Sequence, residues 1–187
     1  MADRLGDATP RSMGRLTLNP LVHLDPIGTL VFFVTQAFGW ARPISINPDN
    51  LTSPRRDLMW IALAGPLANL ILAIFCALLY HLINSLINVI AGSGGAWLIV
   101  PFQQMVVAGV VVNLSLGLIN LIPIPPLDGG RILAGLLPQS SAGFLEKIDS
   151  YGAILLVILV LSDSLSFFLL PLLSTLTGLL LYGSITY

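Results

Sequence analysis

The chain has 187 residues, of which 56% are hydrophobic and only 9% are charged, and its mean hydropathy is +0.92. A soluble domain usually carries about 25% charged residues, so these charges are too few to cover a 20.0 kDa globule with a polar surface. The formal net charge of -1 argues against a nucleic-acid-binding surface. The composition therefore predicts an integral membrane protein with no nucleic-acid partner.

Residues 1–23 are polar and rich in Arg and Pro, without the apolar core of a signal peptide. They are predicted to form a cytoplasmic N-terminal segment. Residues 24–40 form the first apolar stretch, which is 17 residues long and contains Asp25, Pro26 and two glycines. A spanning helix needs about 20 mostly apolar residues, so this stretch is either a re-entrant hairpin or a short span.

Three longer apolar stretches follow, and each is long enough to cross a bilayer. Residues 58–82 and 97–122 are continuous, and Trp97 stands where an interfacial aromatic anchor would stand. The last stretch, 151–182, is interrupted by Asp163 and Pro171. It is either one long tilted span or a span followed by a second, shorter helix.

The basic residues decide how these stretches are predicted to lie. The positive-inside rule places Lys and Arg in the cytoplasm, and residues 83–96 carry no charge. If residues 24–40 dip into the membrane and return, every basic group is cytoplasmic. The sequence thus predicts one all-α, polytopic membrane domain over 1–187, a bundle of three to five transmembrane helices with a re-entrant hairpin. The basic groups are Arg4, Arg11 and Arg15 before the hairpin, Arg42, Arg55 and Arg56 after it, and Arg131 and Lys147 after the third stretch.

Small and polar residues recur on one face of the second and third stretches. Residues at i and i+4 share a helical face, small residues let membrane helices approach closely, and asparagine can hydrogen-bond across the contact. These faces are predicted to be packing interfaces at Gly65, Gly109 and Gly117, whereas Asn120 is set apart by the sequence that follows it. The two faces consist of Gly65, Asn69, Ala73 and Ala77 in one stretch, and Gly109, Asn113, Gly117 and Asn120 in the other.

The third stretch ends in the run Asn-Leu-Ile-Pro-Ile-Pro-Pro-Leu-Asp-Gly-Gly-Arg, which begins at Asn120. Pro123, Pro125 and Pro126 cannot continue a helix, so they predict an extended, stiff segment at the cytoplasmic edge of the membrane. Two glycines after Asp128 permit a sharp turn. An Asp-Gly pair alone is usually only a turn, but an ionisable residue at membrane depth indicates a functional site.

Together these segments resemble the site-2 proteases, a family of intramembrane zinc metalloproteases. The Asn120 run matches the family pattern Asn-x-x-Pro-x-Pro-x-Leu-Asp-Gly, and the resemblance extends to about residue 160. The other matching segments, which resemble a short bacterial branch, are Leu-Gly-Asp at 5–7, residues 14–28, Phe-Gly-Trp-Ala-Arg-Pro at 38–43, and Ala-Gly-Pro-Leu-Ala-Asn at 64–69.

The resemblance implies hydrolysis of peptide bonds in membrane-embedded substrates, with Zn2+ as cofactor and a multi-pass location in a bacterial-type plasma membrane. It implies that Asp128 is the third zinc ligand, and that Asn120 positions the substrate strand or polarises its carbonyl. Asn69, Pro123 and Pro125 are implied to bind substrate. The partners implied are a transmembrane substrate protein and the lipid bilayer.

The family's other two zinc ligands belong to a His-Glu-x-x-His helix, which places both imidazoles on one face, and this pattern is absent here. We expect that the helix is missing from the start of the sequence, so that this chain alone binds no catalytic zinc tightly and is inactive. A true inactive relative is the alternative. His81 lies about 24 Å along its helix from Gly65. It is therefore expected to face the opposite leaflet from Asp128, and the two side chains cannot share a zinc ion. His23, close to Asp25, is expected to be hydrogen-bonded within its loop.

Three functions therefore compete. The first is a site-2-type intramembrane zinc endopeptidase. The second is a non-catalytic membrane adaptor, or pseudoprotease, that binds partner transmembrane helices. The third is a small transporter or channel, with Asn69, Asn113 and Asn120 lining a path. A transporter would usually show a repeat or more spans, and the sequence has neither.

Overall fold

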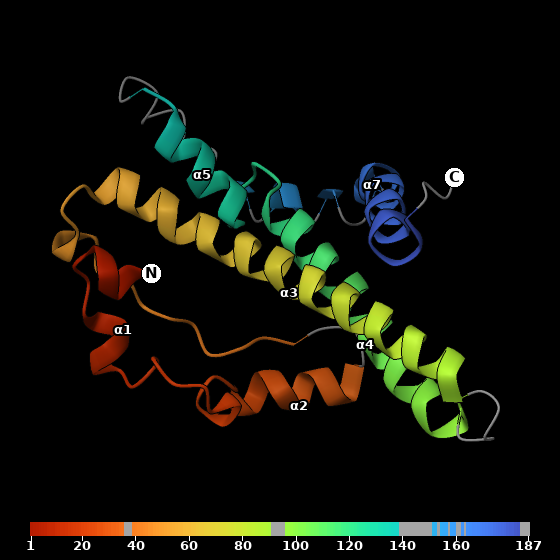
Figure 1. The fold of residues 1–187 in the computed structure, drawn as a ribbon. Coiled ribbons are helices and arrows are strands. Elements are labelled where there is room, and N and C mark those ends of the chain that lie inside the picture. Colours follow the sequence, from red (N-terminus) through yellow and green to blue (C-terminus); the bar gives the residue numbers. More distant parts are fainter. Residues whose placement is uncertain are drawn as a thin grey trace. The chain divides into compact units, whose positions relative to one another are not determined.

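The structure is a computed structural model, and it describes residues 1–35, 39–90, 96–138, 151–152, 154–156, 158–159, 162 and 164–183. Helices are the regular structure over these ranges, with an isolated bridge between Leu24 and Ala41. In chain order (Figure 1) they are the 3-10 helix Ala2–Leu5, α1 Thr9–Ser12, the 3-10 helix Pro20–Val22, α2 Pro26–Thr35, the 3-10 helix Pro48–Asn50, α3 Pro54–Ile90, α4 Ala96–Asn120, α5 Asp128–Leu136 and α7 Ser164–Tyr182. The prediction of an all-α protein is confirmed for these residues.

The chain forms two compact units, Met1–Ile61 and Ala62–Tyr187, and the division falls inside α3. The first unit is organised around Asp7, whose side chain is fully buried. Its carboxylate accepts hydrogen bonds from the Thr9 hydroxyl at 2.5 Å, the Asn50 amide at 3.0 Å and the Asn47 backbone N–H at 2.9 Å. These donors, the Thr9 hydroxyl foremost, hold the pKa of Asp7 well below its usual range. The carboxylate thus ties the N-terminal turns to the loop before α3.

The predicted hairpin, residues 24–40, begins and ends at neighbouring points. Leu24 bridges Ala41 in antiparallel fashion, and the Arg42 N–H donates to the His23 carbonyl at 2.9 Å. Ten-residue α2 is only about 15 Å long. A Cβ atom on Gly28 would lie 2.2 Å from the Trp40 carbonyl oxygen, so glycine lets the returning chain press against the helix. This return agrees with a hairpin rather than one straight span, while its depth in a membrane stays a prediction.

In the second unit, α3 and α4 pack against each other through part of their predicted small faces, whereas Gly65 lies beside Asp128 of α5 (Asp128–Leu136). Their core is Ala73, Ala77, Val110 and Leu114 with Leu181 of α7. A Cβ atom on Gly109 would lie 2.9 Å from Cys76 Sγ, so the two helices meet closely there. Helix α4 also packs on α7.

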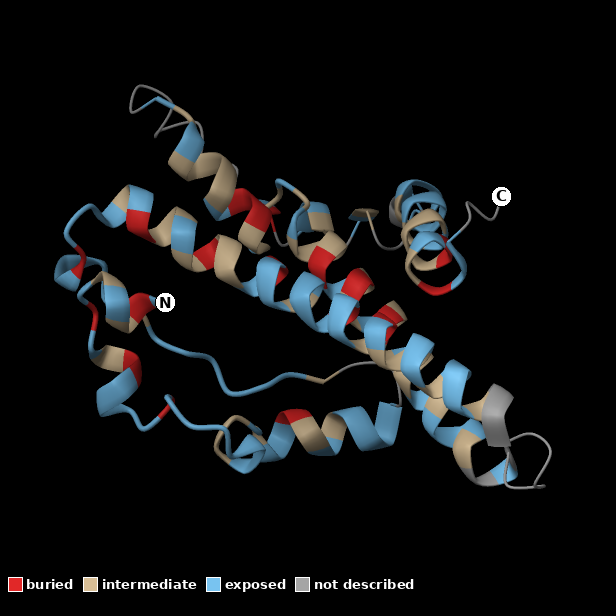
Figure 2. Ribbon diagram, viewed as in Figure 1, coloured by how far each residue is buried: buried red, intermediate tan, exposed pale blue. Residues whose placement is uncertain are grey.

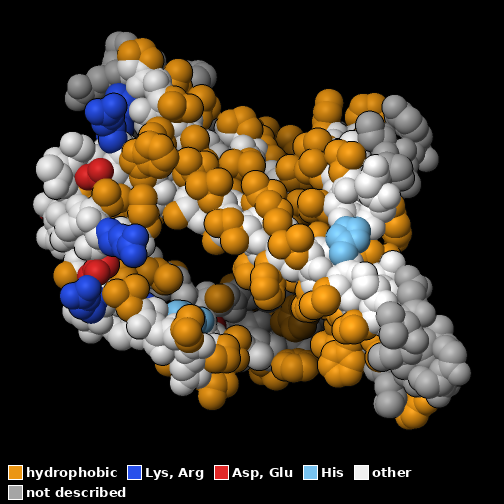
Figure 3. All heavy atoms as spheres, in the orientation of Figure 1, with side chains coloured by type: hydrophobic (Ala, Val, Ile, Leu, Met, Phe, Trp, Pro, Cys, Tyr) orange, Lys and Arg blue, Asp and Glu red, His pale blue; other side chains and the backbone are white. Residues whose placement is uncertain are grey.

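Helices α3 and α4 have the length and hydropathy of membrane spans, over Pro54–Ile87 and Ile99–Asn120. Only 22% and 17% of their most apolar windows are buried, and Figure 2 shows exposed residues along both helices. Figure 3 shows hydrophobic side chains over the middle of α3. The core helix of a soluble protein would hide such a surface, so these helices fit a lipid environment.

The predicted spans 58–82 and 97–122 lie on α3 and α4, although α4 already ends at Asn120. In the last stretch, 151–182, a turn at Ser162 precedes α7, and Pro171 lies inside α7 without ending it. The structure therefore favours two helical parts, with the break before Ser164. Asp163 and Lys147 lie outside the described residues.

Candidate functional site

The proline segment after α4 is folded into turns, so the predicted extended segment is wrong. The Ile124 N–H donates to the Ile122 carbonyl at 2.7 Å, and the Leu127 N–H donates to the Ile124 carbonyl at 3.0 Å. The second bond encloses Pro125 and Pro126. Prolines end the helix, as expected, but their fixed φ also suits a turn. We call residues 121–127 the proline loop; it leads directly from α4 to α5.

The two glycines after Asp128 also have a role other than the predicted sharp turn. Both lie in the first turn of α5 and are buried. A Cβ atom on Gly129 would lie 2.2 Å from the Ile122 carbonyl oxygen, and one on Gly130 would lie 2.7 Å from the Pro125 nitrogen. Glycine is needed at both positions because the first turn of α5 rests on the backbone of the proline loop. This contact fixes the loop relative to Asp128.

Asp128, the first residue of α5, is half-buried, and its carboxylate lies against α3. A Cβ atom on Gly65 would lie 3.1 Å from Asp128 Oδ2, so the absence of a side chain leaves room for the carboxylate. Burial raises the pKa of Asp128, and the positive charge of Arg131 opposes that shift. A carboxylate held between a helix start and a glycine of another helix suits metal ligation or hydrogen bonding.

The side chains of Asn113 and Asn120 are held by hydrogen bonds within their own helix. Asn120 Nδ2 donates to the Leu116 carbonyl at 2.9 Å, and Asn113 Nδ2 donates to the Gly109 carbonyl at 2.8 Å. Asn69 lies across from Gly117, where an added Cβ atom would be 3.6 Å from Asn69 Cβ. An amide nitrogen carries two hydrogens, so Asn120 keeps a second donor for a ligand.

Of the predicted substrate-binding prolines, Pro123 is exposed, whereas Pro125 is half-buried against Gly130. No pattern in the sequence predicted a second neighbour of Pro125, which is Gly152. A Cβ atom on Gly152 would lie 2.2 Å from the Pro125 carbonyl oxygen. A glycine in an apolar run is common, so only the fold reveals this contact.

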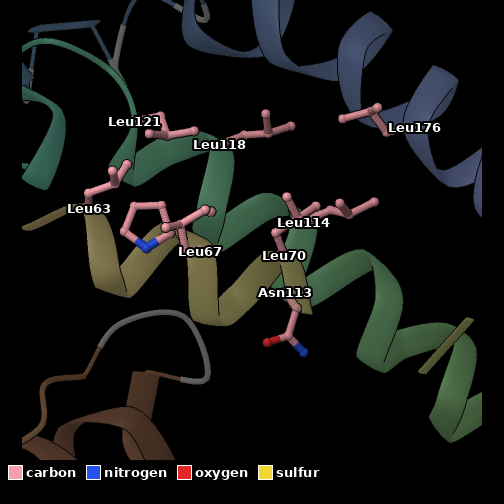
Figure 4. A pocket seen from close by; sticks show the side chains of 10 residues that line it. Leu63, Leu67, Leu70, Asn113, Leu114, Leu118, Leu121 and Leu176 are labelled. Atoms are coloured by element: carbon pink, nitrogen blue, oxygen red, sulfur yellow. The ribbon is translucent and has the colours of Figure 1, made fainter. Parts of the chain in front are cut away.

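The sequence also did not reveal an apolar cavity of about 280 Å³ between α3, α4 and α7. Figure 4 shows leucines of the three helices turned toward one another around it, whereas the amide of Asn113 points away. The cavity begins at Pro66 and Leu63, within one turn of Gly65. The cavity is lined almost entirely by apolar residues, and Asn113 is the one polar residue among them.

Both histidines have other partners, and for His23 this is the expected hydrogen bond within its loop. The ring nitrogen Nε2 of His81 lies 2.9 Å from the Leu180 carbonyl oxygen, which ties α3 to α7, and that of His23 lies 3.1 Å from the Thr17 carbonyl oxygen. Within the described ranges, no group of three or more His, Cys, Asp or Glu side chains is placed to hold a metal. A catalytic zinc uses three protein ligands. Asp128 alone therefore does not fit a zinc site.

Long apolar helices with exposed sides, and a half-buried carboxylate at the end of a proline loop, define a polytopic membrane protein with a candidate site at Asp128. The sequence model described as "Peptidase family M50" matches residues 80–162, which include the proline loop and Asp128. The chain belongs to this family, the membrane-embedded site-2 proteases.

Three curated relatives are similar over most of the chain. "Putative zinc metalloprotease YwhC" of Bacillus subtilis (strain 168) is 37% identical over 177 residues, which are 93% of this chain and 77% of that protein. "Putative zinc metalloprotease Rip2" of Mycolicibacterium smegmatis and that of Mycobacterium tuberculosis are each 27% identical over 168 residues, 87% of this chain and 60% of theirs. No solved structure matches the chain.

Proposed function

We propose that this chain forms the substrate-binding and carboxylate-bearing part of a site-2-type intramembrane zinc endopeptidase. The observation that carries the proposal is the placement of Asp128: its carboxylate rests against Gly65 of α3, at the end of a loop packed on buried glycines. A ligand must be held rigidly to be useful in catalysis. The relatives' names and the family support a zinc-dependent peptidase.

In this proposal, the zinc ligand set is incomplete in these 187 residues. Their two histidines bond backbone carbonyls, and the sequence holds no His-Glu-x-x-His. We infer that two further ligands lie outside this sequence, and that the 187 residues alone bind zinc weakly and cleave nothing.

The residues that are present serve the substrate in this proposal. The second N–H of Asn120 donates to a backbone carbonyl of the substrate, while Asn69, Pro123 and Pro125 border the strand. The substrate is a transmembrane helix that unwinds locally, because a peptide bond inside an intact helix is shielded by its neighbouring turns. All Lys and Arg residues face the cytoplasm of a bacterial-type cell in this arrangement.

The test compares two versions of the protein, the 187-residue chain and the same chain preceded by an added helix with His-Glu-x-x-His. Both are co-expressed with a tagged single-span substrate, and the zinc content of each is measured after purification. We expect well under one zinc and no cleavage for the shorter version, and one zinc with cleavage for the longer version. Asp128→Ala should abolish both properties, whereas Asp3→Ala, a carboxylate paired with Arg11, should preserve them.

Two results would refute the proposal. One is a tightly bound zinc in the 187-residue chain that disappears with Asp128→Ala, and the other is cleavage that survives Asp128→Ala. Among the residues that the structure describes, no three His, Cys, Asp or Glu side chains lie together to hold a metal, which favours a second candidate, an adaptor without catalysis. Stable capture of the single-span protein by the longer version, without cleavage or zinc, would establish that candidate instead.

A further inference from the structure

The backbone of the proline loop has a second support, from a glycine far along the chain. Gly152 is buried, and a Cβ atom on it would lie 2.2 Å from the Pro125 carbonyl oxygen and 2.7 Å from the carbonyl carbon. On the other side of Pro125, a Cβ atom on Gly130 would lie 2.7 Å from the ring nitrogen. Pro125 is thus enclosed between two glycines from different parts of the second unit.

The contact at Gly152 leaves no room for adjustment by a side chain. Non-bonded heavy atoms are comfortable at about 3.5–4.0 Å, so an added methyl group would overlap the carbonyl by more than an ångström. The atoms that it meets belong to the backbone and cannot rotate away. The proline loop, or the helical residues 151–152, would have to move.

Movement of the loop would reach Asp128 directly. The loop ends one residue before Asp128, and the Gly130 N–H donates to the Leu127 carbonyl at 3.1 Å. Gly129, next to Asp128, lies on the carbonyls of Leu121 and Ile122. A shift of the loop at Pro125 therefore changes the support on which α5 begins.

We propose that Gly152 is a positioning residue: by carrying no side chain, it lets residues 151–152 hold Pro125, and through the proline loop it fixes the carboxylate of Asp128. The catalytic consequence rests on the proposed function, whereas the contact itself does not. A misplacement of about 1 Å can cost on the order of a hundredfold in rate. The glycine therefore matters to the reaction without touching the substrate.

The first experiment uses the unaltered 187-residue chain in lipid nanodiscs. Solid-state NMR with labelled glycine and proline should show a cross-peak between Gly152 Cα and the Pro125 carbonyl carbon. The absence of this cross-peak, with other interhelical peaks present, overturns the proposal. Because no variant is needed, a failure of Gly152→Ala to fold does not affect this test.

The second experiment measures amide hydrogen exchange in Gly152→Ala, with Tyr151→Ala as the matched control because the Tyr151 side chain is 68% exposed. We expect the amides of Ile124, Leu127 and Gly130 to exchange about tenfold faster or more in Gly152→Ala. Amides in the middle of α3 should be unchanged, as should all of these amides in Tyr151→Ala. Unchanged exchange in the proline loop overturns the proposal.

The third experiment separates positioning from general stability in the longer, zinc-binding version. Gly152→Ala should lower kcat at least tenfold with KM changed less than twofold, and Tyr151→Ala should leave both constants unchanged. A loosened loop with unchanged kcat overturns the positioning role. If the wild-type version shows no cleavage, the proposed function fails, while the NMR and exchange results still decide whether Gly152 fixes the loop.

Discussion

The contact between Gly109 of α4 and Cys76 of α3 gives a quantitative test of how the two helices pack. A Cβ atom added at Gly109 would lie 2.9 Å from Cys76 Sγ, whereas one added at Gly117 would meet its nearest neighbours at an ordinary 3.6 Å. Both positions are glycines on the same face of α4. Gly109→Ala and Gly117→Ala are therefore a matched pair that differs in the space available.

The two single substitutions combine opposing effects. Replacing a helical glycine with alanine gains about 1 kcal/mol of helix propensity, and overpacking a core costs about 1–3 kcal/mol. The sign of the change in unfolding free energy for Gly109→Ala alone is therefore uninformative. A double-mutant cycle with Cys76→Ala cancels the contribution of helix propensity and leaves the interaction free energy between the two side chains. We expect a coupling of about 1 kcal/mol between Gly109→Ala and Cys76→Ala, in the sense that removal of Sγ relieves the overlap.

The assay is the free energy of unfolding in mixed micelles as the denaturing detergent is increased, measured for the wild type, the three single variants and the two double variants. The coupling between Gly117→Ala and Cys76→Ala should stay below about 0.5 kcal/mol, since they share no neighbour. Equal couplings at both glycines would refute the packing of α3 on α4 described above.

The remaining predictions concern the site, the membrane and the first unit. In the longer version, Asn120→Ala should lower turnover with zinc retained, whereas Asp128→Asn should damage both, because a neutral amide is a poorer ligand; metal analysis beside kinetics separates them. In a Cys76-free background, single cysteines near Arg11 and near Arg55 should be labelled from the same side, and labelling from opposite sides would exclude the hairpin. Replacing glycine with leucine at the cut site of the substrate should slow cleavage, and faster cleavage would contradict local unwinding. Because the pKa of Asp7 is depressed on folding, its stabilising effect is complete above about pH 3.9 and is lost as pH falls below that value; exchange at the Asn47 amide, corrected for intrinsic pH dependence, should rise in acid, and Asp7→Asn should already show it at pH 7.

Hydropathy predicted the long helices well because burial in lipid depends mainly on composition and length. The stretches 58–82 and 97–122 lie on α3 and α4, and the small-residue periodicity identified their contact. These are local properties of a helix and its faces. The position of the break before α7 could not be predicted, since both Asp163 and Pro171 were candidates. A membrane helix tolerates a proline when neighbouring groups satisfy the backbone carbonyl that the proline leaves unpaired.

The proline loop shows where local rules stopped being sufficient. Three prolines predict that a helix ends, but they are compatible with both an extended chain and a turn. The backbone hydrogen bonds donated by Ile124 and Leu127 show that the chain forms turns. The glycines after Asp128 predict a sharp turn, whereas in the structure they provide close contact with the backbone of the proline loop. Asp128 itself was identified from its motif. Its neighbour Gly65 and the support at Gly152 depend on distant parts of the chain, which no local pattern describes.

The unequal lengths of the helices make the protein sensitive to bilayer thickness in one place more than another. With 37 residues, α3 is about 55 Å long, far more than the hydrocarbon core of about 30 Å. It can tilt or project and still cover a thicker membrane. With 19 residues, α7 is about 28 Å long and has no such reserve. The hydrogen-bonding contact between His81 of α3 and the Leu180 carbonyl near the end of α7 joins two helices of unequal length, so a change in lipid chain length acts on the two helices unequally.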